Sequence, residues 1–374
     1  MKRIPYPSIA AVCKAALLLV LLGVLGACTT MGTQEAGPSK VDLHPVFPPP
    51  PDPAKYIFER SITSSADVVK EDSTERFKYM VTGARQEGEG LAKPFAVAVH
   101  HGRVYVTDTA RRAVLLFDIP GRRFAILGQE EGPGELAMPM GIATDAAGNI
   151  YVVDGSNKRV VIYDGNGKYL SALGGPSWFH RPSGIAVTPD GSRVYVVDTG
   201  GVETDEHRVR VFDTASGKHL FDIGKRGTGP GEFNMPIYAA IGPDHLLYVV
   251  DAMNFRVQEF KLDGTFVRTF GAIGEQSGQF MRPKGIALDP SGLVYVVDAA
   301  FGNFQIFTPE GKLLLAVGNR GDDVPGRYML PSGIAIDDDG RVYVVDQFYR
   351  KLDVYRPADL PADAGFVART PRKG

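Results

Sequence analysis

The pattern of apolar and polar positions repeats six times along the chain. In each copy an aromatic and β-branched run, such as Tyr195-Val196-Val197, ends at an aspartate, here Asp198. Such a run predicts a strand that is buried on both faces. The aspartates lie 44 to 53 residues apart, a period that suits a four-stranded propeller blade. They are Asp108, Asp154, Asp198, Asp251, Asp298 and Asp346.

The residues around this run predict three further strands in each copy. Upstream, a proline opens a strand with few large side chains, as in residues 182–187. Asp190-Gly191 then marks a hairpin turn. Downstream, residues 160–163 predict a third strand, and a fourth strand ends at a glycine such as Gly174. The first strand is poor in large side chains, so six copies can converge on a central channel. The predicted fold is an all-β, six-bladed β-propeller of four-stranded blades.

The sixth copy lacks its fourth strand, because a polar, proline-rich tail follows Arg356. Residues 77–83 have the pattern of a fourth strand and no blade of their own. We therefore expect this N-terminal strand to complete the last blade and close the ring, which removes exposed sheet edges. The predicted boundaries are a lead-in segment over 56–76, the propeller over 77–356 and a disordered tail over 357–374.

The loop after the second strand carries a motif in the second and fourth copies. It reads Asp-x-x-Asn-x-Arg-Val and is formed by Asp154, Asn157 and Arg159, and by Asp251, Asn254 and Arg256. This motif resembles the signature of the NHL repeat family of propellers. The resemblance covers roughly residues 77–356 and implies the fold, while it implies no activity, since one fold hosts many functions. We expect the repeated aspartates and arginines to play a structural part, tying each loop to its neighbour.

Composition narrows the class of function. The 374 residues include 44 Gly and 27 Pro, which suits a turn-rich β fold. The formal net charge of −2 leaves no basic surplus, so we expect no nucleic-acid partner. Two cysteines exclude a disulfide framework, a cysteine-rich zinc module and an iron–sulfur site. The chain also has no Gly-x-Ser-x-Gly elbow and no phosphate-binding loop.

The N-terminus predicts a secreted protein. A positive region with Lys2 and Arg3 leads to an apolar run over 15–25 that is short for a membrane-spanning helix. The run ends at Leu25-Gly26-Ala27-Cys28, which resembles the bacterial lipobox. That resemblance implies a signal peptide over 1–27 and a lipid, such as palmitate, on the Cys28 sulfur. An ordinary signal peptide and an uncleaved anchor are the alternatives.

The segment after Cys28 sets the expected location. Residues 28–55 include four consecutive prolines and predict an extended tether. Thr29 stands where lipoproteins retained at the inner membrane carry aspartate, so the resemblance favours the outer membrane. We expect a bacterial cell-envelope protein that contacts the membrane through its lipid.

The histidines do not assemble an evident metal site. In a propeller the links between blades and the loops after the second strands share one face, here called the first face, and His180 and His207 lie there. Catalytic zinc takes three protein ligands, so we expect no cofactor and no catalytic residue. A divalent metal held by oxygen ligands in the channel stays open.

A family comparison leads to the same expectation. Related propeller lyases that cleave α-hydroxyglycine peptides carry histidine directly after the first-strand proline in three blades. The residues at those positions here are Phe95, Met140, Ser183, Ile237, Lys284 and Ser332. None is histidine, so the zinc ligands of those lyases are absent.

The first face is rich in aromatic, methionine and cationic side chains, which are frequent at interfaces. The candidate binding residues are Trp178, Phe179, His180, Arg181, His207, Met235, Tyr238, Phe255, Arg282, Lys284, Phe301, Tyr328, Phe348 and Tyr349. The leading hypothesis is a binding or scaffolding module for an envelope protein or a small ligand. The alternative is a metal-dependent hydrolase or lyase with its site on the channel. A third option is a small-ligand or sugar sensor that uses Trp178 as a stacking platform.

Overall fold

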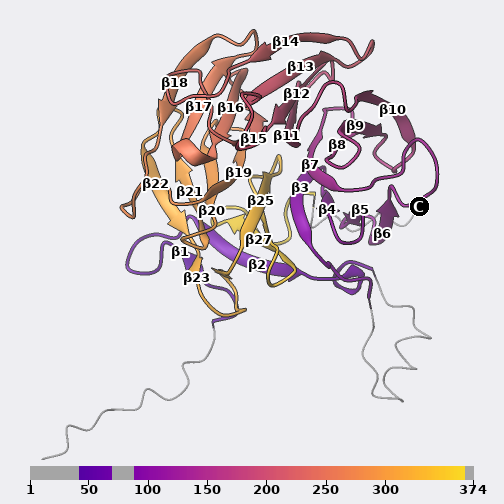
Figure 1. Cartoon of the computed structure of the whole chain (residues 1–374). Coiled ribbons are helices and arrows are strands. Elements are labelled where there is room, and N and C mark those ends of the chain that lie inside the picture. The colour runs from indigo at the N-terminus through magenta and orange to yellow at the C-terminus, as the bar shows by residue number, and fades with distance from the viewer. Residues whose placement is uncertain (1–41, 70–87, 367–374) are drawn as a thin grey trace, which may run out of the picture. The chain divides into compact units, whose positions relative to one another are not determined.

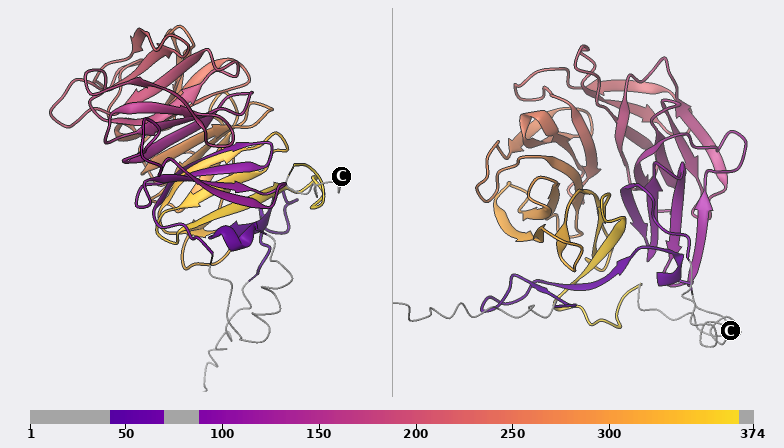
Figure 2. Two further views of the ribbon diagram at one scale, coloured as in Figure 1. Left: turned by 90° about the vertical axis from the view of Figure 1, so that its right-hand side faces the viewer. Right: turned by 60° about the horizontal axis from the view of Figure 1, so that its bottom comes forward.

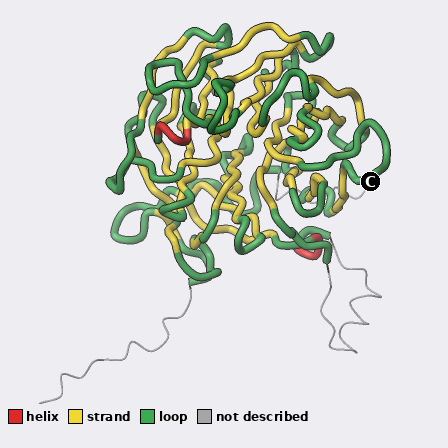
Figure 3. The backbone as a smooth tube through the Cα atoms, in the orientation of Figure 1, coloured by secondary structure: helices red, strands yellow, loops and turns green. Residues whose placement is uncertain are grey.

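The computed structural model describes residues 42–69 and 88–366. The predicted signal peptide, Cys28 and the start of the tether lie outside these ranges. The described residues belong to one unit and form six sheets that follow one another around a central channel (Figure 1). Figure 3 shows that strands dominate, with two single-turn 3-10 helices, η1 (Ser65–Asp67) and η2 (Ala252–Asn254). In this part of the chain, no helix is long and apolar enough to cross a membrane.

The sheets confirm the predicted six-bladed, all-β propeller. Blade one contains β3 (Pro94–His100), β4 (Arg103–Asp108), β5 (Ala113–Asp118) and β6 (Arg123–Leu127). Blade two contains β7 (Pro139–Thr144), β8 (Ile150–Asp154), β9 (Arg159–Tyr163) and β10 (Tyr169–Gly174). Blade three contains β11 (Pro182–Val187), β12 (Arg193–Asp198), β13 (Arg208–Asp213) and β14 (His219–Ile223).

The second half of the ring repeats this order. Blade four contains β15 (Pro236–Ile241), β16 (Leu246–Asp251), β17 (Arg256–Lys261) and β18 (Phe266–Phe270). Blade five contains β19 (Pro283–Leu288), β20 (Val294–Asp298), β21 (Asn303–Phe307) and β22 (Leu313–Val317). Blade six contains β25 (Pro331–Ile336), β26 (Val342–Asp346), β27 (Lys351–Pro357), β2 (Tyr56–Ile62) and β1 (Val46–Phe47). The link between blades five and six carries a short parallel pair, β23 (Asn319–Arg320) and β24 (Arg327–Tyr328).

The core lies between neighbouring blades. The second strands are buried except for the first residue of β4, β12 and β16, because each is covered on both faces by the adjoining sheets. One cluster joins Tyr195 and Val197 of blade three to Leu247 and Val249 of blade four. The Tyr195 hydroxyl also donates to the carbonyl oxygen of Leu262 in blade four, at 2.8 Å. A single blade therefore cannot bury its own faces, and stability requires the ring.

The ring is closed by an N-terminal strand, but by a different one from the strand that the pattern favoured. Strand β2 pairs antiparallel with β27, as Figure 2 shows, and supplies the fourth strand of blade six. Its Phe58 is 4% exposed and packs edge-on against Tyr355. Residues 77–83, predicted for this place, lie outside the described residues, and the position is already occupied. Residues 56–62 occupy this position because they bury three apolar side chains against the blade, Tyr56, Phe58 and Ile62. The prediction for residues 77–83 relied on their terminal glycine, which has no side chain to bury.

Two predicted boundaries also change. The propeller begins before residue 77, because β1 pairs with β2 and Phe47 packs edge-on against Tyr355. At the other end, residues 357–366 are not a loose tail. The fully buried Arg341 donates to the carbonyl oxygen of Ala364 at 2.9 Å, and the Phe366 ring stacks on His101. Residues 357–366 therefore cover the Arg341 guanidinium and one face of the His101 ring, which would otherwise face solvent.

Candidate functional site

The repeated aspartates hold the links that enter each blade. Asp198 is fully buried and accepts the backbone N–H groups of His180 and Arg181, the two residues before the proline that opens β11. The equivalent aspartates of the other blades are also fully buried and accept link N–H groups. These bonds fix the residues that come directly before the first-strand proline, which offers no N–H of its own.

The motif asparagines and arginines complete this support. The side-chain amide of Asn157 donates to Asp154 at 2.7 Å, and Arg159 donates to the carbonyl oxygens of Pro133 and Glu135 in the link. In blade four, Arg256 pairs with Asp251 at 2.9 Å and also binds two link carbonyl oxygens. The motif residues are therefore engaged in hydrogen bonds within the fold.

The links converge on a cavity of about 510 Å³ at the first-face end of the central channel. We call it the mouth cavity. Residues beside the first-strand prolines of five blades form about half of its lining. The residues before the proline are Lys93, Met138, Arg181, Met235 and Arg282, and those after it are Phe95, Met140, Ser183, Ile237 and Lys284. Further lining comes from Thr109, Gly155, Pro182, Thr199, Tyr238, Ala252, Met253, Phe255, Met281, Pro283 and Gln347.

Tyr238 forms the floor of the mouth cavity. It extends from blade four to blade one on the opposite side of the ring, where its hydroxyl donates to the carbonyl oxygen of Phe95 at 3.1 Å. The Tyr238 and Phe95 rings stack with centroids 5.9 Å apart. Ser332 of blade six donates to the same oxygen at 2.7 Å. Burial raises the pKa of the Tyr238 phenol well above its ordinary value, so the hydroxyl stays a donor.

The other end of the channel is a separate space. A cavity of about 200 Å³ there is lined by first-strand residues such as Ala98, Ala186 and Ala287. No residue lines both cavities. The mouth cavity is thus a closed-bottomed cup that opens on the first face.

Four cations line the mouth cavity: Lys93, Arg181, Arg282 and Lys284. None of their side chains has a hydrogen-bond or ion-pair partner within residues 42–69 and 88–366. The lining contains no aspartate or glutamate. Burial lowers the pKa of the Lys284 ammonium, and the charges of Arg282 and Arg181 lower it further. The cavity lining therefore carries four cationic side chains and no acidic one, while the buried Asp108, Asp198 and Asp298 accept the backbone N–H groups of Lys93, Arg181 and Arg282.

Methionine forms much of the remaining wall. Five of the nine methionines in the chain line the cavity, namely Met138, Met140, Met235, Met253 and Met281. The polar residues Ser183 and Thr199 are satisfied locally, since their hydroxyl oxygens lie 2.5 Å apart and each is within hydrogen-bond distance of a blade-four carbonyl oxygen. One hydroxyl donates to the other, and the second donates to its carbonyl oxygen. Flexible thioether side chains can adapt to an irregular apolar ligand.

The predicted binding residues divide into two groups. The mouth cavity brings six of them together: Arg181, Met235, Tyr238, Phe255, Arg282 and Lys284. The others lie elsewhere. Trp178 contacts Phe212 and His219 on the outer strands of blade three, and Phe179 is buried beside it. Tyr328 is fully buried, Tyr349 donates to the carbonyl oxygen of Gly321, Phe348 is 61% exposed, and Phe301 is not part of the cavity wall.

The two first-face histidines belong to blade three and do not meet in a metal site. His207 is buried, with Nε2 facing the Gly201 carbonyl oxygen at 3.0 Å while Nδ1 accepts from the N–H of Met235. His180 is exposed beside the same loop. Among the described residues, no group of three or more His, Cys, Asp and Glu side chains is placed to share a metal ion.

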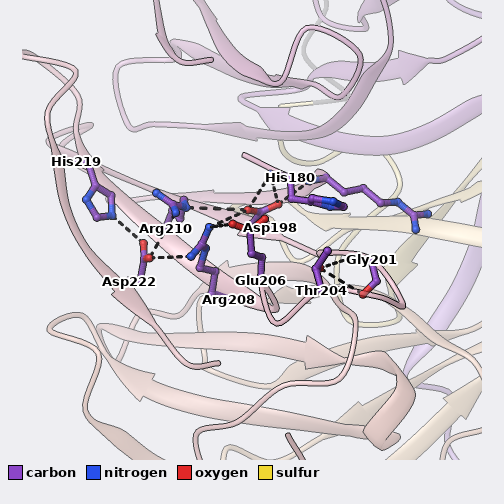
Figure 4. A network of polar contacts seen from close by, with 10 residues as sticks. His180, Asp198, Gly201, Thr204, Glu206, Arg208, Arg210, His219 and Asp222 are labelled. Carbon is purple, nitrogen blue, oxygen red and sulfur yellow. Dashed lines mark hydrogen bonds and ion pairs between the residues drawn. The ribbon is translucent and has the colours of Figure 1, made fainter. Parts of the chain in front are cut away.

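Blade three instead carries a charged network of its own. Figure 4 shows Arg208 and Arg210 directed between Asp198 and Asp222, with ion-pair distances of 3.5 to 4.0 Å. The guanidinium carbon of Arg210 also lies 5.6 Å from the Trp178 ring centroid. None of these four charged residues lines the mouth cavity.

Comparison with protein families agrees with this fold. A family model described as 6-bladed beta-propeller matches residues 87–181 and 177–272, and the NHL repeat model matches residues 280–308. The chain is therefore a six-bladed β-propeller that contains an NHL repeat over residues 280–308. Comparison with curated proteins found no match.

Solved structures share the propeller at low identity. A Bacteroides thetaiotaomicron protein of unknown function has 16% identity and a TM-score of 0.57, with 81% of this chain and 76% of that chain covered. A gluconolactonase from Xanthomonas campestris has 16% identity and a TM-score of 0.55, with 71% and 86% covered. A virginiamycin B lyase from Staphylococcus aureus has 15% identity and a TM-score of 0.52, with 71% and 94% covered. These similarities show the fold alone.

Several lining residues were not among the predicted binding residues, including Lys93, Phe95, Met138, Met140, Met253 and Met281. A signal for them was present in the repeat. The positions that flank the first-strand proline contribute Lys93, Phe95, Met138 and Met140, so aligning the six copies on that proline would have identified about half of the cavity lining.

Proposed function

We propose that this protein is a lipid-anchored binding module of the bacterial cell envelope, and that a small ligand binds in the mouth cavity. The single observation that carries the ligand site is a closed-bottomed cup of about 510 Å³ to which all six blades contribute lining residues. Its volume is in the range of small-molecule sites, roughly 300–1,000 Å³. A concave cup of this kind favours a small ligand over a flat protein partner.

The anchor rests on the N-terminal sequence. The lipobox-like residues 25–28 and the proline-rich tether support attachment through Cys28, with the outer membrane favoured by Thr29. The described N-terminal strands β1 and β2 lie at the outer edge of blade six, and no residue of 42–69 lines the mouth cavity. Attachment at this edge is compatible with an open cup.

The lipid anchor is tested by labelling. Metabolic labelling with palmitate should label the wild type, and Cys28→Ala should lose the label and move to the soluble periplasmic fraction. A labelled Cys28→Ala variant would contradict the anchor.

The ligand site is tested by filling the cavity. Met140→Trp adds volume to the wall of the cup, and folding is checked by circular dichroism. Compounds that raise the melting temperature of the wild type should lose this effect in the variant. Equal stabilisation of both proteins would place the binding site outside the mouth cavity. The cationic lining does not favour a metal-dependent hydrolase, because like charges repel a divalent cation.

A further inference from the structure

The charge on the wall of the mouth cavity has one sign. Lys93, Arg181, Arg282 and Lys284 contribute cationic side chains that lack a partner among the described residues, and no acidic side chain lines the cup. Protein cations normally lie beside carboxylates or in open solvent, since an unpaired cation that is partly withdrawn from water costs free energy. Lys284 is withdrawn in this way, being only partly exposed in the cavity wall. A ligand that brings negative charge would remove this cost.

The cations are not evenly distributed around the cup. Arg181 belongs to blade three, and Arg282 and Lys284 belong to blade five, so they stand on the two sides of blade four. Lys284 directly follows the first-strand proline, the register shared with the floor residue Phe95. The charges of Arg282 and Arg181 both act on Lys284, so the three cations share one region of the wall, with the two arginines exposed and Lys284 partly buried.

Most of the remaining lining is apolar. Met138 and Met140 come from blade two, and Phe95 from blade one completes that side. Thioether and aromatic groups offer no strong hydrogen bonds and favour contact with hydrocarbon. The hydroxyls of Ser183 and Thr199, between the two regions, already bond to each other and to backbone carbonyl oxygens.

We propose that the ligand of the mouth cavity is an amphiphilic organic anion. Its carboxylate or phosphate group lies between Arg181, Arg282 and Lys284, and its hydrocarbon part lies against Met138, Met140 and Phe95. This inference rests on the proposed function, because it names the chemical class of the ligand for the same cup. Charge-assisted bonds to the cations give the head group its preference, and apolar burial adds affinity.

Four eight-carbon probes test the class in the mature, purified protein: octanoate, octyl phosphate, octanol and octylammonium. Binding is measured by isothermal titration calorimetry. We expect at least one anion to bind about tenfold or more tightly than octanol, since a hydrogen bond to a charged group contributes that much. We expect octylammonium to bind no better than octanol, and added salt to weaken the anions only. The tighter of the two anions identifies the head group.

Variants link the preference to the cavity. Lys284→Gln should weaken the anion about tenfold and leave octanol unchanged. The matched control is Lys168→Gln, which removes an exposed lysine outside the cavity wall and should leave every affinity unchanged. Arg181→Gln should act like Lys284→Gln and provides a second test if the first variant folds poorly.

The outcomes separate the two proposals. Octanol binding as tightly as both anions would overturn the anionic class and leave the cup as a ligand site. Binding of no probe would overturn the proposed function itself. Equal losses in Lys284→Gln and Lys168→Gln would overturn the assignment of the head group to this cavity.

Discussion

The hydroxyl of Tyr238 in blade four and the carbonyl oxygen of Phe95 in blade one are 3.1 Å apart across the central channel. This bond joins opposite sides of the ring and closes the bottom of the mouth cavity. We expect Tyr238→Phe to lower the free energy of unfolding by about 1 kcal/mol, because the floor ring remains and Ser332 still donates to Phe95. Tyr238→Ala should cost about 3–5 kcal/mol, because it also empties the floor. Urea unfolding measures both, and equal losses would contradict a packing role for the ring.

Ring closure depends on Phe58 of β2. Phe58→Ala should destabilise the protein by about 3 kcal/mol or more, since the side chain is buried against Tyr355 at the junction of the first and last strands. Denaturant unfolding gives the value. The matched control is Phe348→Ala, whose ring is 61% exposed and should matter by less than about 0.5 kcal/mol. Similar losses in the two variants would argue against β2 as the closing strand.

Glu259 gives the protein a pH-dependent stability. Burial raises the pKa of this carboxyl to about 7, although Arg268 at 2.7 Å opposes the shift. A carboxyl with a higher pKa in the folded state holds its proton more tightly there. The free energy of unfolding therefore falls as pH rises from about 4.5 to about 7.

Glu259→Gln removes this titration, so the decrease should become shallower in the variant. It should not vanish, because burial also raises the pKa values of Asp337 and Asp353 to about 6. Unfolding by urea at a series of pH values measures the slope. The same slope in both proteins would show that Glu259 does not titrate in this range.

Anion binding at the mouth cavity should take up protons. Burial lowers the pKa of the Lys284 ammonium, and a bound anion raises it again by favouring the charged form. At alkaline pH the binding enthalpy of octanoate should then depend on the ionisation enthalpy of the buffer. Lys284→Arg should bind without this dependence, because arginine stays charged. A dependence that persists in the arginine variant would assign the proton to another group.

Trp178 should not report on the mouth cavity. The only tryptophan of the chain packs edge-on against Phe212 and beside His219, on the outer strands of blade three. We expect saturating octanoate to leave its emission unchanged and Trp178→Phe to leave the affinity unchanged. A lost affinity in that variant would support the stacking-platform hypothesis and move the ligand to the outer side of the blade.

The candidate site was only partly accessible to sequence reasoning. Arg181, Arg282 and Lys284 were predicted because they occur in links on the first face, and loop positions in a propeller follow directly from strand order. Met138 and Met140 were not predicted, because nothing local separates a methionine that lines a channel from one that packs between sheets. Trp178 was predicted and lies elsewhere, since a link can direct a large side chain outward along the blade.

The sequence by itself determined the number of blades, their strand order and the support of the loops. Each of these depends on contacts within one repeat or between adjacent repeats, such as Asp198 with Arg181. Only the tertiary structure decided which N-terminal segment pairs with β27 and which side chains share the mouth cavity. Phe58 meets Tyr355, and Tyr238 meets Phe95, across long stretches of chain. Local periodicity predicts a strand but not its distant partner, because the partner is chosen by closure of the whole ring.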